Sequence, residues 1–181
     1  AGLELPRLTL PEPRLPALPA GIAAYNVAVA GVGGTGVLTV GRVVGMAASL
    51  DGVGSLVQDV SGLAQKGGAV ISHIRLGQRS ENIAAPHIPL GHADLLLAAD
   101  RVVGSSREAL TLVSPQRSLA IVDAHNTPVA NFIFNRDFDF RQKDSLGEIE
   151  AATRGVFTFD FHRLAVKALG DEIASNLMMV G

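Results

Sequence analysis

The sequence predicts an α/β domain with three layers, α/β/α, built around a mostly parallel sheet. Of the 181 residues, 48% are hydrophobic and only 18% are charged, and short apolar runs alternate with segments of helical periodicity. Uninterrupted apolar runs are typical of strands that are buried on both faces of a parallel sheet. Their alternation with helices predicts the layered arrangement.

The periodicity assigns each element a residue range. The expected strands are residues 26–30, 55–60, 69–76, 93–98, 118–123 and 156–159. The expected helices are residues 35–50, a helix that ends near residue 113, and residues 145–154, 162–169 and 172–180. Ser105 and Glu108 have the spacing of a capping box ahead of the second helix. In the first helix, one face carries Val37, Val40, Val44 and Ala48.

The two ends of the chain differ in character. Residues 1–24 are expected to form a proline-rich linker or arm, and residues 25–181 a single domain. An ordinary extended N-terminus would explain the prolines equally well. The chain begins at Ala1, and we expect it to be an excerpt of a longer protein. At the other end, the apolar residues 177–180 belong either to the core or to an interface, and we favour the interface.

Composition argues against several classes of protein. The formal net charge is -2 and no basic run occurs, which disfavours nucleic-acid binding. Residues 15–41 carry no charged side chain, but their prolines and glycines predict strand, turn and helix instead of a membrane span. Without cysteine, the chain cannot supply thiolates to a disulfide, a zinc site or an iron–sulfur cluster. This composition is consistent with a cytoplasmic location.

A glycine-rich turn is the first candidate site. Gly31, Gly33 and Gly36 form a GxGxxG pattern between an expected strand and an expected helix. Glycine permits positive φ and close backbone approach, and the N-terminus of the helix offers unpaired N–H groups to a phosphate or pyrophosphate. Asp59 stands near the place of the acidic residue in a dinucleotide site, at a somewhat long spacing. A turn that serves only tight strand-to-helix packing is an equally good interpretation.

A second polar loop follows the second expected strand, at residues 61–68 (SGLAQKGG). Its paired glycines allow a backbone nest for an anion, with charge supplied by Lys66. A solvated turn is the alternative. On the next strand, His73 and Arg75 share one face, while Ser72 and Ile74 share the other. Such a His–Arg pair suits a carboxylate or phosphate, or an interface network.

Motifs for catalysis and for metal binding are missing. The five histidines form no HxxxH or HxH pair, which disfavours a metal site. No GxSxG elbow and no Walker lysine occur. Asp123 and His125 are the nearest approach to an acid–base pair, and we expect them to line a polar loop. We therefore assign no catalytic residue.

Both loops resemble those of a known family. The segment GVGGTGVLTVGRVVGMAASLDGVGSLVQDVSGLAQKGGAVISHIRLG, residues 31–77, closely resembles the gamma subunit or domain of 2-oxoacid:ferredoxin oxidoreductases. The segments SHIR, ADLLLAAD, SREAL and GDEIASNLMMVG are most similar to fused indolepyruvate ferredoxin oxidoreductase. The resemblance extends from about Tyr25 to Gly181.

This resemblance implies a role in the oxidative decarboxylation of an aryl-pyruvate-type 2-oxoacid to an acyl-CoA. Thiamine diphosphate and iron–sulfur clusters would lie on partner domains or subunits, ferredoxin would accept the electrons, and the assembly would be an oligomer. The gamma domain would be Rossmann-like and would not be active alone. The residues that match the family's two loops, and are expected to bind cofactor, are Gly31, Gly33, Gly34, Thr35 and Gly36 in the first and Gln65, Lys66, Gly67 and Gly68 in the second. The alternatives are a stand-alone NAD(P)-binding Rossmann module or small dehydrogenase, and a scaffold without ligand.

Overall fold

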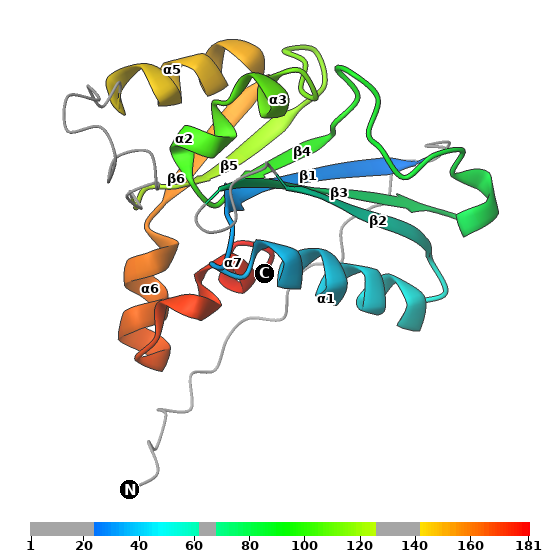
Figure 1. Cartoon of the computed structure of the whole chain (residues 1–181), viewed down its shortest axis with the longest axis horizontal. Coiled ribbons are helices and arrows are strands. Elements are labelled where there is room, and N and C mark those ends of the chain that lie inside the picture. The colour runs from blue at the N-terminus through cyan, green and yellow to red at the C-terminus, as the bar shows by residue number, and fades with distance from the viewer. Residues whose placement is uncertain (1–23, 62–67, 126–141) are drawn as a thin grey trace, which may run out of the picture.

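Figure 1 shows the computed structural model of the chain, in which residues 24–61, 68–125 and 142–181 are described. A six-stranded sheet has the order β2-β3-β1-β4-β5-β6. Its strands are β1 (Tyr25–Val32), β2 (Gly54–Ser61), β3 (Ala69–Gly77), β4 (Leu95–Ala98), β5 (Leu119–Asp123) and β6 (Gly155–Phe159). The helices are α1 (Val37–Leu50), α2 (Arg101–Gly104), α3 (Arg107–Leu110), α5 (Gln142–Ala152), α6 (Phe161–Leu169) and α7 (Ser175–Met178), with two short 3₁₀ turns, η1 (Ser80–Asn82) and η2 (Glu172–Ala174).

The sheet is mostly parallel, as expected, but one strand is reversed. β1, β4, β5 and β6 pair in parallel, whereas β3 is antiparallel to both of its neighbours, β1 and β2. The prediction of a mostly parallel sheet is confirmed, and residues 69–77 form the one reversed strand of this sheet. The chain has only residues 62–68 between β2 and β3, and parallel neighbours need a crossover of about a dozen residues or more.

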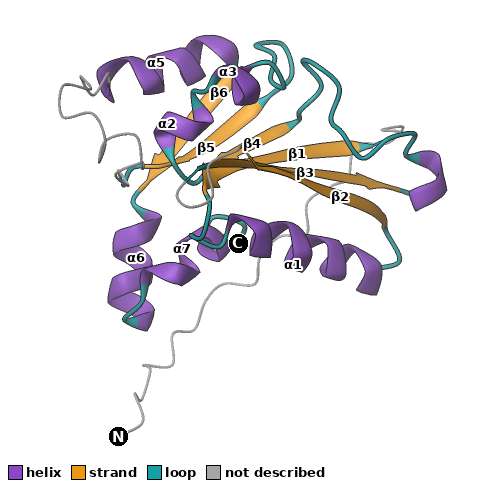
Figure 2. Cartoon of the chain, viewed as in Figure 1, coloured by secondary structure: helices purple, strands orange, loops and turns teal. Residues whose placement is uncertain are grey.

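Helices cover both faces of the sheet, which confirms the three-layer prediction (Figure 2). α1 and α7 lie on one side, and α2, α3 and α5 lie on the other. The core accordingly has two parts. Val40 of α1 and Ile74 of β3 are fully buried in one part, and Leu96 of β4 and Ile149 of α5 in the other. Each such side chain contributes roughly 1.5–3 kcal/mol through its burial.

Two of the expected helices are shorter or start elsewhere than predicted. Ser106, not Ser105, caps α3 by accepting the N–H of Ala109 at 3.3 Å, because Ser105 already ends α2. The helix expected over residues 172–180 is divided into η2 and α7, since Asp171 caps a separate turn by accepting the N–H of Ile173 at 2.9 Å. In the described part of the chain, no helix is both long and apolar enough to cross a membrane.

The first helix packs very closely against the sheet at Gly41. A Cβ atom on Gly41 would lie 2.7 Å from Ser72 Oγ of β3 and 3.0 Å from Val57 Cγ1 of β2. Both distances are shorter than normal van der Waals contact. The absence of a side chain at Gly41 thus allows α1 to lie this close to strands β2 and β3.

We expect Gly41→Ala to lower the free energy of unfolding of the chain by about 1–2 kcal/mol, because overpacking outweighs the better helix propensity of alanine. Gly147→Ala in α5 is the matched control, since a Cβ there would meet nothing within 4 Å. That variant should be neutral or stabilised by up to about 1 kcal/mol. Urea denaturation of both variants measures the difference, and equal stabilities would contradict the close approach of α1 to the sheet.

Candidate functional site

The glycine-rich turn joins β1 to α1 at the carboxyl end of β1. Gly34 and Gly36 both have φ of 92°, a left-handed conformation that favours glycine, and Gly36 is the N-cap of α1. The Thr35 hydroxyl donates to the carbonyl of Val32 at 2.8 Å. A Cβ on Gly31 would lie 2.6 Å from Val37 Cγ2, so that position needs glycine for space. The turn directs the N-terminus of α1 toward the sheet edge, as the sequence predicted.

The second loop ends beside this turn. The N–H of Gly33 donates to the carbonyl of Gly68 at 2.8 Å, and Val32 pairs with Ala69. The predicted residues of the first loop and Gly68 of the second therefore lie together at one edge of the sheet. Gln65, Lys66 and Gly67, also predicted to bind cofactor, lie outside the described residues.

Asp59 does not complete a dinucleotide site. It is exposed on β2, and its Oδ1 accepts the Ser72 hydroxyl at 2.6 Å. In the classical dinucleotide fold, the acidic residue follows the strand next to β1. Here β3 separates β2 from β1, and two strand spacings correspond to roughly 10 Å. The hypothesis of an NAD(P)-binding module, which was based on the glycine pattern and on Asp59, is therefore no longer supported by Asp59.

A cavity of about 400 Å³ adjoins the turn at the carboxyl ends of β1, β4 and β5. Segments far apart in the sequence line it: the turn itself, the ends of the strands, the start of α6, and the residues around η2 and α7. Its titratable lining residues are Asp100, Asp123, His125, His162, Asp171 and Glu172. Of these, sequence reasoning singled out only Asp123 and His125.

The C-terminal segment closes one side of this cavity. The side-chain amide of Asn176, which is buried, donates to the carbonyl of Thr35 at 2.7 Å. Met179 is also buried and packs in the core under α1, whereas Leu177 and Val180 stay partly exposed. The expectation of an interface for residues 177–180 therefore does not hold for Met179. No local pattern could have indicated Asn176, because its partner lies 141 positions away.

The cavity is acidic. Asp100 and Asp123 are almost fully buried, and burial raises the pKa of both carboxyl groups. Asp100 accepts the N–H of Val103 and Asp123 the backbone N–H of His125, each at 2.9 Å. No lysine or arginine is among the described lining residues. The cavity therefore favours ligand groups that donate hydrogen bonds, such as hydroxyls and amines, over phosphates.

The two histidines of the cavity contact each other. The rings of His125 and His162 stack with their centroids 3.7 Å apart and their planes 5° from parallel. His162 Nδ1 lies 3.5 Å from Glu172 Oε2, which links α6 to η2. Asp123 contacts the backbone of His125, an arrangement typical of a loop and not of an acid–base couple.

His73 and Arg75 hold a neighbouring loop in place. They share one face of β3, as predicted, and both contact the segment at residues 85–88. His73 Nδ1 accepts the N–H of Ile88 at 3.2 Å, and Arg75 Nη1 donates to the carbonyl of Ala85 at 2.7 Å. Burial lowers the pKa of His73, which favours its neutral form. Over residues 24–61, 68–125 and 142–181, no group of three His, Asp or Glu side chains could hold a metal ion.

Several known proteins are similar to this chain. Indolepyruvate oxidoreductase subunit IorB of Pyrococcus horikoshii is 29% identical over 162 residues, which cover 87% of this chain and 75% of that protein. Among solved structures, pyruvate oxidoreductase subunit PORC of Thermotoga maritima has a TM-score of 0.59 at 15% identity, covering 86% of this chain and 72% of that one.

Two further structures share the fold. The gamma subunit of a keto/oxoacid ferredoxin oxidoreductase from Geobacter sulfurreducens has a TM-score of 0.54 at 20% identity, covering 84% of this chain and 71% of that one. A 2-oxoglutarate:ferredoxin oxidoreductase from Magnetococcus marinus, solved with 2-oxoglutarate, coenzyme A and succinyl-CoA, has a TM-score of 0.59 at 14% identity, covering 85% of this chain and 23% of that one. The α/β fold described above is therefore that of known gamma subunits.

The family itself follows from the sequence. The family model described as Pyruvate ferredoxin/flavodoxin oxidoreductase matches residues 26–181, which include the turn, the sheet and the C-terminal segment. The chain belongs to the pyruvate ferredoxin/flavodoxin oxidoreductase family.

Proposed function

We propose that this chain serves an enzyme that decarboxylates indolepyruvate or a related aryl pyruvate oxidatively and forms an acyl-CoA. The observation that carries the proposal is the family match over residues 26–181, combined with the 29% identity to an indolepyruvate oxidoreductase subunit. Ferredoxin would take the electrons in the cytoplasm. The proposal assigns this chain to ligand binding and assembly, not to bond making or breaking.

The redox and decarboxylation chemistry would belong to partner components. An iron–sulfur cluster does not fit this chain, because it contains no cysteine to bind the iron. Thiamine diphosphate has no support in this sequence either, since Gly170 and Asp171 are followed by Glu172 and not by the glycine of a GDG motif. We therefore derive no step through either group here.

Coenzyme A fits the turn better than either of those groups. We propose that Gly31, Gly33, Gly34, Thr35 and Gly36, with Gln65, Lys66, Gly67 and Gly68, bind its phosphates. Support comes from the left-handed glycines at the N-terminus of the 14-residue helix α1, whose first N–H groups suit an anion. The lysine would add a positive charge.

The adjoining cavity would take a part of the ligand that carries no phosphate. Its carboxylates, Asp100 and Asp123 among them, accept hydrogen bonds from hydroxyl and amino groups such as those of a nucleoside. The chain's contribution would be to bind and orient coenzyme A next to the partner that carries the reacting acyl group.

The assembled enzyme should reduce ferredoxin in the presence of coenzyme A and indolepyruvate, and more slowly with pyruvate. The 181-residue chain alone should neither turn over substrate nor show visible iron–sulfur absorbance, because it has no cysteine. Spectrophotometric assays over a panel of 2-oxoacids measure both. Failure of the assembled enzyme with every 2-oxoacid would contradict the proposal.

Gly34→Ala should raise the KM of the assembled enzyme for coenzyme A by about tenfold, because alanine disfavours the left-handed turn that presents the N–H groups. Gly52→Ala is the matched control: Gly52 also has positive φ, and a Cβ at either position would meet nothing within 4 Å. It follows the far end of α1 and should leave the KM within about twofold. An equal KM in both variants would show that the turn serves only packing.

Asp100→Asn should make the stability of the chain less dependent on pH. Burial raises the pKa of Asp100 above its ordinary value of 3.8, so its contribution to stability is fully present below that pH and is lost as the pH rises through the native value. Asparagine keeps the cap of α2 without the charge. Denaturant titrations across the acid range should show a smaller loss in the variant.

A further inference from the structure

The helices on the two sides of the sheet have different outer surfaces. Among the described residues, every exposed large apolar side chain that lies on a helix belongs to the side of α1, α6, η2 and α7. None belongs to α2, α3 or α5. Both sides have a complete inner face against the sheet. The two sides therefore differ in how many apolar side chains their helices expose to solvent, not in how they pack against the sheet.

α1 is apolar on its outward face as well as its inward one. Val43 is 46% exposed, Met46 65% and Leu50 81%, and Leu38 of the first turn is also exposed. Arg42 is the helix's one charged residue. A helix that is apolar all round is normally buried, and a scarcity of charge is typical of the centre of a protein interface.

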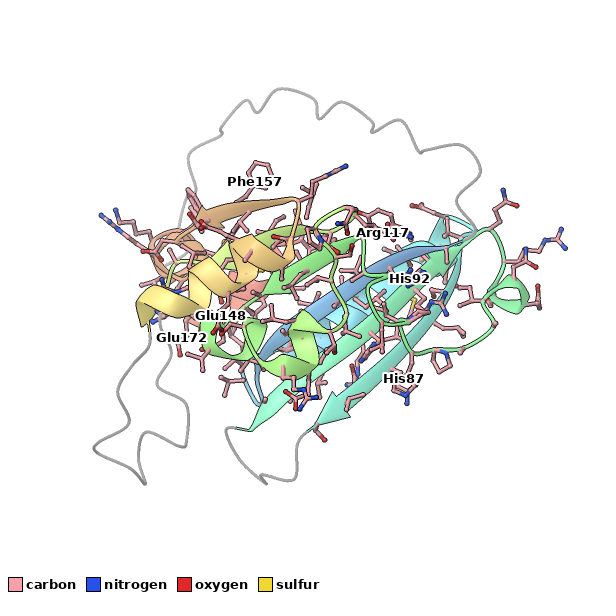
Figure 3. All side chains as sticks on the ribbon, turned by 90° about the horizontal axis from the view of Figure 1, so that it is seen from above. His87, His92, Arg117, Glu148, Phe157 and Glu172 are labelled. Atoms are coloured by element: carbon pink, nitrogen blue, oxygen red, sulfur yellow. The ribbon has the colours of Figure 1, made fainter. Side chains whose placement is uncertain are left out.

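α5, on the opposite side, is the internal comparison. It has an ordinary solvent-exposed surface, with Glu148 and Glu150 among its exposed residues and Ile149 buried beneath. Figure 3 looks onto this side and labels Glu148 on α5. The same fold thus has one helix suited to water and one helix that is not.

The apolar face of α1 is continuous with the ligand site. α1 starts directly after Gly36 of the turn, and α7 lies beside its first residues, where Asn176 donates to the carbonyl of Thr35. Leu177 of α7 is 37% exposed. A polypeptide that covers the α1 face would therefore also adjoin the turn.

We infer that the outer face of α1, formed by Leu38, Val43, Met46 and Leu50, docks the component of the same enzyme that carries its redox centre. The partner surface is apolar and places a carboxylate opposite Arg42, which is the one charged residue of α1. This inference rests on the proposed function, because that reaction requires a redox centre and the chain has no cysteine to hold a cluster. A second copy would not supply the redox centre, because it too has no cysteine.

The absence of cysteine allows a direct test in the assembled enzyme. Met46→Cys and Leu90→Cys each place one thiol in this chain, at positions that are 65% and 74% exposed here. Maleimide labelling of the native enzyme, followed by mass spectrometry of the peptides, gives the two rates. Cys at position 46 should react at least about tenfold more slowly than Cys at position 90. Equal rates would overturn the inference.

Cross-linking from position 46 identifies the occupant. A heterobifunctional maleimide reagent on Met46→Cys should join a peptide of another component or domain of the enzyme. A cross-link to α1 of a second copy, or to residues 1–23 of the same chain, would overturn the assignment. Protection that appears only after anionic vesicles are added would overturn it in favour of a membrane surface.

The charge of Arg42 gives a second readout. In the Met46→Cys background, Arg42→Glu should speed labelling at least about threefold, because it opposes like charges at the contact. Arg107→Glu, on the exposed surface of α3, should leave the rate unchanged. Equal effects of the two variants on the labelling rate would show that no partner carboxylate lies opposite Arg42. Labelling does not depend on turnover, so an enzyme that is protected at position 46 but inactive on aryl pyruvates would contradict the proposed function and leave the docking surface standing.

Discussion

The reversal of β3 is the constraint on which the candidate site depends. Because β3 runs antiparallel to β1, it starts where β1 ends, and the N–H of Gly33 meets the carbonyl of Gly68 at 2.8 Å. Gly68, the last residue of the second loop, thereby lies beside Gly33 of the first loop. The same reversal places β3 between β1 and β2, which takes Asp59 away from the turn. One change of strand direction thus brings Gly33 and Gly68 together, as the proposed anion site requires, and moves Asp59 away from the position it would hold in a classical dinucleotide site.

The C-terminal segment packs against the glycine turn and forms a wall of the cavity beside it. Asn176 joins α7 to the turn through the carbonyl of Thr35, and Met179 anchors the segment in the core under α1. The ends of β4 and β5 contribute the buried carboxyl groups of Asp100 and Asp123. The resulting cavity adjoins the glycine turn and is lined by these buried carboxyl groups. In the proposed function, the turn would bind the phosphates of the ligand and the carboxyl groups would accept hydrogen bonds from its hydroxyl groups.

Sequence reasoning was most successful where periodicity determines structure. The strands β1, β2 and β5 and the inward face of α1 lie close to their predicted residues, since burial of one face imposes a regular pattern. The apolar run of β3 could not reveal that this strand is reversed, because such a run does not depend on strand direction. The expected helix over residues 172–180 was wrong because Asp171 caps a separate turn, η2. The cavity was mostly missed because its lining residues come from distant segments, and Asn176 has no motif.

The outer face of α1 differs from these features because folding of the chain does not explain it. Val37, Val40 and Ala48 already fill the contact of the helix with the sheet, so Met46 and Leu50 add nothing to the core. Exposed apolar residues favour association and aggregation, and α5 shows that the fold accepts a polar outer surface. In the proposed function, a chain without cysteine would depend on close contact with the component that holds the cluster. The position of this face beside the glycine turn would let the same contact bring the partner to the bound ligand.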